Sequence, residues 1–254
     1  MVRISIAPVK ALHVVHPEEV ELTRAGVVGD RRFWLLDADA RLANGKRFPQ
    51  LMQVRPEWDE STRKLALAFP GGERLEGVVE PGEPVEATLY GVDHPSRVVS
   101  GPWQEALTEL AGEPLTLLWS EHGAVDRGAD RGGWASIVSR ASLERLGAEA
   151  GAASPPDGRQ FRMLFEIDGV AAHEEDEWIG RHVRVGDAVL MPLGDVGRCV
   201  VTTRDPDTSE FAFDTLNVLA AYRREGVAEP LPFGVYCGVA VPGRVRVGDS
   251  VVPA

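Results

Sequence analysis

The sequence predicts a mainly β protein with some α, in which two β-barrel-like domains follow each other along the chain. Short runs of alternating apolar and polar residues fill the N-terminal part, and such alternation is typical of half-buried strands. Turn-forming pairs, among them Gly71-Gly72 and Pro81-Gly82, separate these runs. Barrels fit this pattern because closing a sheet removes the exposed edges that many short strands would otherwise leave.

Taken in order, the strands expected in the first part are Val2–Ile6, Val20–Leu22, Phe33–Leu36, Leu65–Phe69 and Val85–Leu89. A helix is expected over Trp103–Leu110, where apolar residues recur at helical spacing up to Ala111-Gly112. We place a domain boundary there. The first domain is expected to span residues 1–112 and the second residues 113–254.

The second part begins with a polar, glycine-rich loop around residues 121–133. A short helix is expected over Ser142–Ala150, with Ser139 or Ser142 as its cap. Strands resume over Phe161–Ile167, where apolar residues return.

One pattern occurs twice in this second part. The two copies are HVRVGDAVL at residues 182–190 and RVRVGDSVV at residues 244–252. A Gly-Asp pair between alternating runs indicates a hairpin, because glycine tolerates the positive φ that tight turns require. We therefore expect both copies to be structural turns.

Composition and charge exclude several classes of protein. The net charge of −12 gives an acidic surface that repels phosphate backbones, so we expect no nucleic-acid partner. The N-terminus, MVRISIAPVK, lacks the apolar run of a secretion signal, and no stretch reaches the length of a membrane span. We therefore expect a cytoplasmic protein that does not associate with a membrane. Two cysteines are too few for a disulfide scaffold, an iron–sulfur cluster or a four-cysteine zinc site.

The two cysteines lie in different surroundings. Cys199 is part of the run GRCVVTTRDPDT, which is rich in hydroxyl and charged residues. It is either a small buried hydrophobe on a strand, as most free cysteines are, or a thiolate stabilised by Arg198 and Arg204. A positive field lowers the pKa of a thiol and makes it a nucleophile or a ligand for a soft metal. Cys237 lies in the apolar run PFGVYCGVAV, so we expect it to be buried.

Several motifs, in a fixed order, resemble those of the MOSC family, whose molybdenum-cofactor members include amidoxime-reducing proteins. The family's signature is close to R-C-I-L-T-T-V-D-P-D-T, and RCVVTTRDPDT differs from it at positions 200, 201 and 204. The family's ending is similar to PFGVYCGVAVPGRVRVGDSV. The β-barrel domain that precedes MOSC in this family has motifs similar to ISIAPVKAL, GDRRFWLLDADARL and KRFPQL. The resemblance covers nearly the whole chain.

The resemblance implies a molybdenum cofactor, molybdopterin, with Cys199 as a ligand of the metal. The pterin carries a phosphate, so its pocket needs fixed cations. The family's cofactor-contacting positions correspond to Lys10, Arg32 and Arg162. Lys46 stands where an arginine is usual, and lysine gives phosphate a less directional contact than arginine.

The signature and its neighbours supply the rest of the expected site. Arg198, Thr202 and Thr203 flank Cys199 and complete the expected cofactor-binding set. Arg31 and Arg32 are adjacent, so on a strand they face opposite sides and at most one enters a pocket. We expect that one to be Arg32.

An acidic residue near the cysteine and one departure from the family pattern are expected to affect the reaction that the site catalyses. Asp205 matches an acid near the family's metal, so we expect a role in proton transfer that depends on burial raising its pKa. Leu164 stands where the family commonly has asparagine. The site is then more apolar, and the substrate range or reaction type is expected to differ. The entrance is expected to be lined by the polar loop that carries Asp126, Arg127, Asp130 and Arg131.

The resemblance implies an oxidoreductase that reduces N-hydroxylated small molecules such as amidoximes and hydroxylamines. The chain has no flavin or iron–sulfur motif of its own, so the electrons are expected from an external flavin or iron–sulfur protein. Two other functions stay open, namely a sulfur carrier with a persulfide on Cys199 and a protein that carries the cofactor without turnover. Pyridoxal phosphate is a further ligand that the resemblance brings in. The cations at positions 10, 32, 46 and 162 favour a pterin pocket over a bare sulfur carrier.

Overall fold

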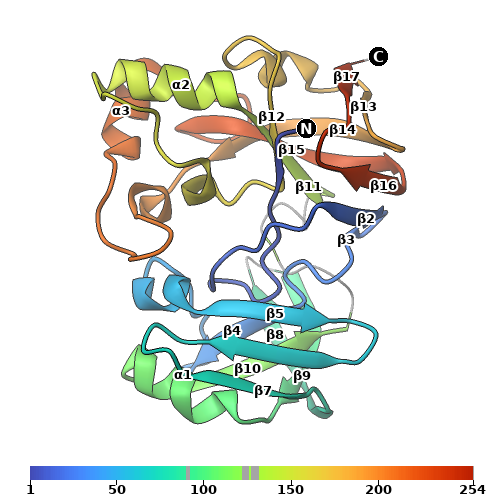
Figure 1. The fold of residues 1–254 in the computed structure, drawn as a ribbon, viewed down its shortest axis with the longest axis vertical. Coiled ribbons are helices and arrows are strands. Elements are labelled where there is room, and N and C mark those ends of the chain that lie inside the picture. Colours follow the sequence, from blue (N-terminus) through green and yellow to red (C-terminus); the bar gives the residue numbers. More distant parts are fainter. Residues whose placement is uncertain (90–91, 122–125, 127–131, 254) are drawn as a thin grey trace.

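The computed structural model describes residues 1–89, 92–121, 126 and 132–253. Figure 1 shows two bodies, one above the other. The upper one, which we call the larger body, is built on a curled seven-stranded sheet. Its strands, in spatial order, are β1 (Arg3–Ile4), β12 (Phe165–Ile167), β11 (Ala135–Ser139), β15 (Pro232–Val241), β14 (Ala188–Gly197), β13 (Val183–Val185) and β17 (Val251–Pro253).

A second sheet and two helices complete the larger body. The sheet contains β16 (Gly243–Arg246), β2 (Glu19–Thr23) and β3 (Gly26–Val27). The helices are α2 (Arg140–Glu149) and α3 (Thr215–Tyr222), which lie together at one end of the large sheet (Figure 1).

The smaller body contains two antiparallel sheets and one helix. One sheet has the order β4 (Phe33–Asp37), β10 (Leu115–Ser120), β9 (Val92–Val99) and β8 (Pro81–Leu89). The other has the order β5 (Arg55–Asp59), β6 (Lys64–Ala68) and β7 (Arg74–Val78), and α1 (Trp103–Ala111) packs against this body. The expected mainly β architecture with some α is confirmed.

Each body has its own apolar core. Phe165, Trp178 and Ile137 are fully buried in the larger body. Phe33 and Trp103 are buried in the smaller one. Burial of such side chains supplies the main driving force for folding each body. Among the described residues, the structure contains no helix with the length and apolarity needed to cross a bilayer.

The chain crosses between the bodies at both ends of the smaller one. The N-terminal strands β1 and β2 pair with β12 and β16, which come from the C-terminal half of the sequence. Conversely, β10 pairs with β4 and β9 in the smaller body, although it follows residue 112. The division of the chain at residue 112 stays a prediction. The segments that cross place N-terminal residues beside residues of the C-terminal half.

Both helices predicted from spacing are present. Gly112 ends α1 in the left-handed conformation, with φ of 78°. Ser139 caps α2, and its side chain accepts a hydrogen bond from Ser142 N at 3.1 Å. Local capping chemistry is therefore enough to define these two helix ends.

One local prediction is wrong, and a second is confirmed only in part. The strand expected over Phe161–Ile167 is shorter, because η3 (Gly158–Phe161) is a 3-10 helix and Arg162 adopts the left-handed conformation that ends it. The first Gly-Asp pair does join a hairpin, β13 to β14. The second copy is a turn, as expected, but it joins no hairpin, since β16 pairs with β2 and β17 pairs with β13. The same turn chemistry there sends the chain from one sheet to another.

Candidate functional site

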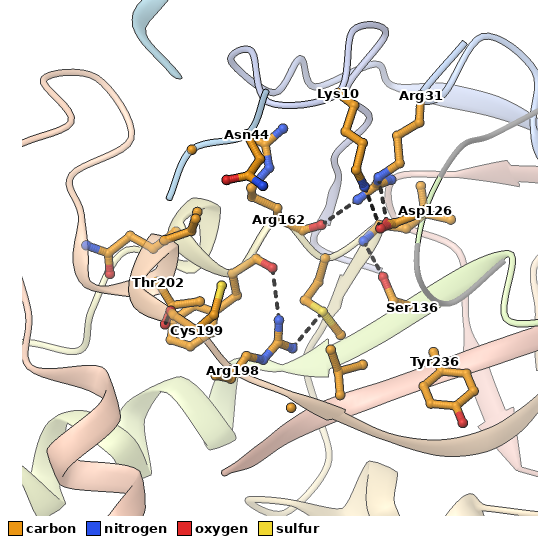
Figure 2. A pocket seen from close by; sticks show the side chains of 18 of the residues that line it. Lys10, Arg31, Asn44, Asp126, Ser136, Arg162, Arg198, Cys199, Thr202 and Tyr236 are labelled. Atoms are coloured by element: carbon orange, nitrogen blue, oxygen red, sulfur yellow. Dashed lines mark hydrogen bonds and ion pairs between the residues drawn. The ribbon is translucent and has the colours of Figure 1, made fainter. Parts of the chain in front are cut away.

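A cavity of about 490 Å³ lies where the two bodies meet. Its wall combines N-terminal residues, such as Lys10 and Arg31, with residues of the larger body, such as Arg162 and Cys199. A cavity of this size is typical of a small-molecule or cofactor site. Figure 2 shows Cys199 on one side of the view and Lys10, Arg31 and Asp126 on the opposite side. We call these the thiol end and the cationic end.

The thiol end is built by one turn. Cys199 is half-buried and directly precedes η5 (Val200–Thr203), a 3-10 turn. Thr202 Oγ1 donates to the carbonyl of Cys199 at 2.9 Å, and Thr203 Oγ1 donates to the carbonyl of Val200 at 2.7 Å. Thr215, at the start of α3, donates to the carbonyl of Thr202 at 2.7 Å. Hydroxyl groups thus fix the backbone that presents the cysteine sulfur to the cavity.

Arg198 holds this turn against the rest of the larger body. Its guanidinium donates to the carbonyls of Phe161 and Phe233 and to the sulfur of Met163, as Figure 2 shows in part. Burial lowers the pKa of Arg198 to about 10, and the nearby Cys199 and Glu229 oppose that effect. At neutral pH the arginine therefore remains charged directly behind the cysteine.

The cationic end is assembled from three parts of the chain. Lys10 Nζ lies 2.7 Å from Asp126 Oδ1, and Arg31 Nε lies 2.8 Å from Asp126 Oδ2. Arg31 also donates to the carbonyl of Arg162 at 3.3 Å and forms an ion pair with Asp30. These contacts connect the N-terminal segments to the larger body. The Asp126 carboxylate thus forms ion pairs with two cations, Lys10 and Arg31, that could otherwise bind an anionic ligand.

Burial dominates the electrostatics of the cationic end. It lowers the pKa of Arg162 to about 10, with the adjacent Arg31 lowering it further. Burial also lowers the pKa of Lys10, while Asp126 opposes the shift. An anion that entered here would raise the pKa of both groups, because an opposite charge at short range favours the charged state. The arrangement is therefore suited to a phosphate.

A separate polar network joins the bodies beside the thiol end. His13 is buried, and its Nδ1 lies 2.9 Å from the carbonyl of Pro206, in the loop after η5. Its Nε2 lies 3.1 Å from Arg55 Nη1 on β5. Asp207 forms ion pairs with Arg55 and with Arg159. The loop that follows Cys199 is thus tied to the smaller body.

Six of the residues predicted for the site line the cavity: Lys10, Lys46, Arg162, Arg198, Cys199 and Thr202. Lys46 is exposed at its edge, whereas the other five are partly or fully buried. Thr203 lies behind the wall, where it stabilises the turn. The structure brings the cations and the cysteine together from segments far apart in sequence.

The choice between Arg31 and Arg32 is corrected. Arg31 lines the cavity, whereas the Arg32 guanidinium stacks on Trp119 at 4.7 Å and lies 3.8 Å from Glu60. The alternation argument failed because Arg31 is not in extended backbone. It has φ of 48° in the turn before β4, which redirects its side chain.

Asp205 is a second correction. Its Oδ1 accepts hydrogen bonds from the backbone N–H groups of Asp207 at 2.9 Å and Thr208 at 2.8 Å, so it organises its own loop and does not line the cavity. Arg204 also lies outside the wall, with Nη1 donating to the carbonyl of Ser209. Of the loop expected at the entrance, Asp126 lines the cavity, and residues 127, 130 and 131 lie outside the described residues.

Leu164 lines the cavity as expected, but it is buried in the core of the larger body. Sequence reasoning missed other wall residues: Asn44, Gln160, Glu229 and Tyr236. Asn44 carried a signal, since Asn-Gly marks a turn, and its Oδ1 accepts from Lys46 N at 3.0 Å. Glu229 lies in a polar stretch without such a signal.

Comparison with known proteins finds matches to both parts of the chain. A model of the MOSC N-terminal beta barrel domain matches residues 1–102, and a model of the MOSC domain matches residues 132–252. Mitochondrial amidoxime reducing component 2 of Rattus norvegicus is 35% identical over 284 residues, which cover 98% of this chain and 81% of the rat protein. Mitochondrial amidoxime-reducing component 1 of Homo sapiens is 27% identical, over 97% of this chain and 80% of the human protein.

A third relative has a different name. Molybdenum cofactor sulfurase of Oryza sativa subsp. japonica is 23% identical over 99% of this chain, which corresponds to 35% of the rice protein. The two domain models occur in the order expected from the motifs and together match most of the chain. The protein is therefore a member of the MOSC family, with a MOSC N-terminal beta barrel domain followed by a MOSC domain.

Proposed function

We propose that the cavity binds a molybdenum cofactor and that the protein reduces N-hydroxylated compounds such as amidoximes with electrons from an external protein. One observation carries the proposal. A single cavity has a cysteine sulfur at one end and three partly buried cations, Lys10, Arg31 and Arg162, at the other. The names of the rat, human and rice relatives support both the cofactor and the substrate class.

The residues present fit such a group. Thiolate sulfur is a donor for soft metal centres, and the cations can bind the phosphate of a pterin. Among the described residues, no three His, Cys, Asp or Glu side chains gather as a metal-binding cluster. A metal at Cys199 would therefore take its other ligands from the cofactor, which a molybdopterin supplies.

The chain's own residues would bind and orient the cofactor. Cys199 would hold the metal, and Lys10, Arg31 and Arg162 would hold the phosphate, with the Lys10–Asp126 and Arg31–Asp126 ion pairs opening to admit it. Arg198 and Thr202 fix the position of the cysteine backbone. When bound, the cofactor supplies two-electron redox chemistry. The overall reaction removes the oxygen of an N–OH group as water and consumes two electrons and two protons.

The electron donor is proposed to be a separate flavin or iron–sulfur protein, because the two cysteines of this chain cannot ligate such a cluster. The cytoplasm, which the sequence favours, remains a prediction, and the rat and human relatives are named as mitochondrial.

Two alternatives use the same cysteine. A sulfur carrier with a persulfide on Cys199 needs an accessible thiol, but it does not need the partly buried cations at the far end of the cavity. A cofactor carrier would use both ends without turnover. One relative, from rice, is named a sulfurase, and this name favours testing the two carrier functions beside the reductase.

Turnover tests the proposal. Protein produced in a cofactor-synthesising host should reduce benzamidoxime to benzamidine with reduced methyl viologen as the artificial donor. Cys199→Ser should abolish the activity, and Cys237→Ala should retain it, because Cys237 is fully buried in the apolar core away from the cavity. Loaded wild-type protein without turnover would contradict the reductase and favour a carrier. A persulfide found without pterin would favour the sulfur carrier.

A further inference from the structure

The proposed function gives one acid of the cavity wall, Glu229, no part in holding the cofactor. Glu229 lies between α3 and β15 and lines the cavity beside Gly197, Arg198 and Cys199. Its Oε2 accepts a hydrogen bond from Gly197 N at 3.2 Å. The carboxylate therefore stands against the strand end that leads into the cysteine, at the thiol end.

A buried carboxylate fixes the backbone that carries Glu229. Asp195, on β14, is buried and accepts hydrogen bonds from three consecutive backbone N–H groups. Its Oδ1 lies 2.9 Å from Ala228 N and 2.8 Å from Glu229 N, and its Oδ2 accepts from Val227 N. Such charge-assisted bonds are stronger than neutral ones. They hold this segment against the strand.

Two glycines leave the space that Glu229 occupies. A Cβ at Gly197 would lie 2.5 Å from Glu229 Oε2, and a Cβ at Gly226 would lie 2.1 Å from the Glu229 carbonyl oxygen. Both distances are far below van der Waals contact, so any larger residue would move the acid. A buried aspartate and two glycines thus combine to place one carboxylate at the thiol end.

The charged groups differ between the two ends. Asp30 and Asp126, the other acids in the described part of the wall, form ion pairs with Arg31 and Lys10 at the cationic end. Glu229 lies at the other end, beside the charge of Arg198. A carboxylate in the wall of a cavity is suited to a ligand that carries a positive charge, because opposite charges attract strongly at short range.

We propose that Glu229 recognises the positive charge that appears on the substrate nitrogen, and so makes the site selective for substrates that yield amidines and related strong bases. The inference rests on the proposed function. An amidoxime is a weak base, and its N–O bond breaks as two electrons and three protons are taken up. Water leaves, and an amidinium cation remains. A fixed carboxylate stabilises such developing charge more than it stabilises the neutral substrate.

Calorimetric titration of cofactor-loaded protein with benzamidine and with benzamide tests this directly. The two ligands have nearly the same shape, but only benzamidine is a cation at neutral pH. Wild-type protein should bind benzamidine about tenfold more tightly than benzamide, as expected when one charge-assisted hydrogen bond is lost. Glu229→Gln should bring the two affinities to within about twofold.

Glu225→Gln is the matched control, because it removes the same charge from an exposed position of the same segment that does not line the cavity. It should keep the wild-type preference. A preference that survives in Glu229→Gln, or is missing in wild type, overturns the inference. A purely structural role for Glu229 would lower the thermal midpoint of Glu229→Gln and leave the preference intact.

The binding ratio is independent of turnover, so the two proposals can fail separately. Wild-type protein that shows the preference but does not reduce benzamidoxime contradicts the proposed function alone. Protein that reduces benzamidoxime, with the same KM and the same binding preference in Glu229→Gln, contradicts only the role of Glu229.

Discussion

The cationic end of the cavity is assembled from distant parts of the chain, whereas the thiol end is built mainly by one turn of the larger body. At the cationic end, Lys10 and Arg31 come from the N-terminal crossing segments and reach across to Asp126 and Arg162. At the thiol end, hydroxyl groups of η5 and α3 bond the backbone around Cys199.

The two ends therefore depend on different parts of the structure. The anion site exists only when the crossing segments are packed against the larger body, because its cations come from both. The cysteine turn depends on local hydrogen bonds and on the partly buried Arg198. Changes at the thiol end should therefore affect the stability of the larger body, and changes at the cationic end should affect anion binding. The following experiments test that division, beginning with the largest expected effect.

Replacing Arg198 with alanine should lower the free energy of unfolding by about 3 kcal/mol. The carbonyls of Phe161 and Phe233, two buried residues, would lose their charged donor. Urea denaturation measures the change. Arg184→Ala, at an exposed position of β13, should stay within about 0.5 kcal/mol of wild type. Equal stability of Arg198→Ala and wild type would show that the turn is held by its hydroxyl groups alone.

Replacing Arg31 with alanine should weaken binding of inorganic phosphate to cofactor-free protein about tenfold, since one charge-assisted contact is lost. Arg32→Ala should leave the affinity unchanged, because its guanidinium stacks on Trp119 outside the cavity. Isothermal titration calorimetry at constant salt compares them. An equal loss in both variants would mean that only the net charge matters, and the assignment of Arg31 to the site would fail.

His13 gives the junction beside the thiol end a pH dependence. Its geometry requires the neutral ring, with Nδ1–H donating to the carbonyl of Pro206 and Nε2 accepting from Arg55. Burial, followed by the charge of Arg55, lowers the pKa of His13 below its ordinary value of 6.5. The unfolded chain therefore takes up the proton first, so this contribution is complete above pH 6.5 and is lost as the pH falls below it.

His13→Asn tests this contribution, since asparagine keeps a donor and cannot be protonated. At pH 8 the variant should be about 1 kcal/mol less stable than wild type. The difference should shrink as the pH falls below 6.5. Urea titrations across this range measure it, and a difference that stays constant with pH would show that His13 does not titrate on unfolding.

The smallest effect is expected at Asp126. Its carboxylate forms ion pairs with Lys10 and Arg31, so it competes with an entering anion for these cations. Asp126→Asn should bind inorganic phosphate about threefold more tightly, in line with the strength of partly exposed ion pairs. Asp39→Asn, at an exposed position away from the cavity, should bind as wild type does. Weaker binding in Asp126→Asn would indicate that the acid orients the cations instead.

Local chemistry made much of the fold predictable. The ends of α1 and α2 follow from Gly112 and Ser139, and the first Gly-Asp turn joins a hairpin as expected. The second Gly-Asp turn has the same residues but leads into another sheet. Strand partners depend on contacts over long sequence distances, which a local pattern does not contain.

The site was predictable where a motif or a resemblance marked it, as at Cys199, Lys10 and Arg162. Arg31 was missed because its left-handed backbone breaks the alternation that a strand would show. Asp205 matched a family position, yet its side chain is used by its own loop. Glu229 meets Gly197 only after the chain has passed through α3, so its place in the wall depends on tertiary packing.

The molybdenum content of protein purified from a cofactor-synthesising host tests the central claim most directly. Wild type and Cys237→Ala should each contain about one molybdenum and one pterin per chain, because Cys199 is intact in both. Cys199→Ser should contain much less metal, since its hydroxyl is a poor substitute for a thiolate ligand. A Cys199→Ser protein that keeps the wild-type metal content would show that this sulfur does not hold the cofactor.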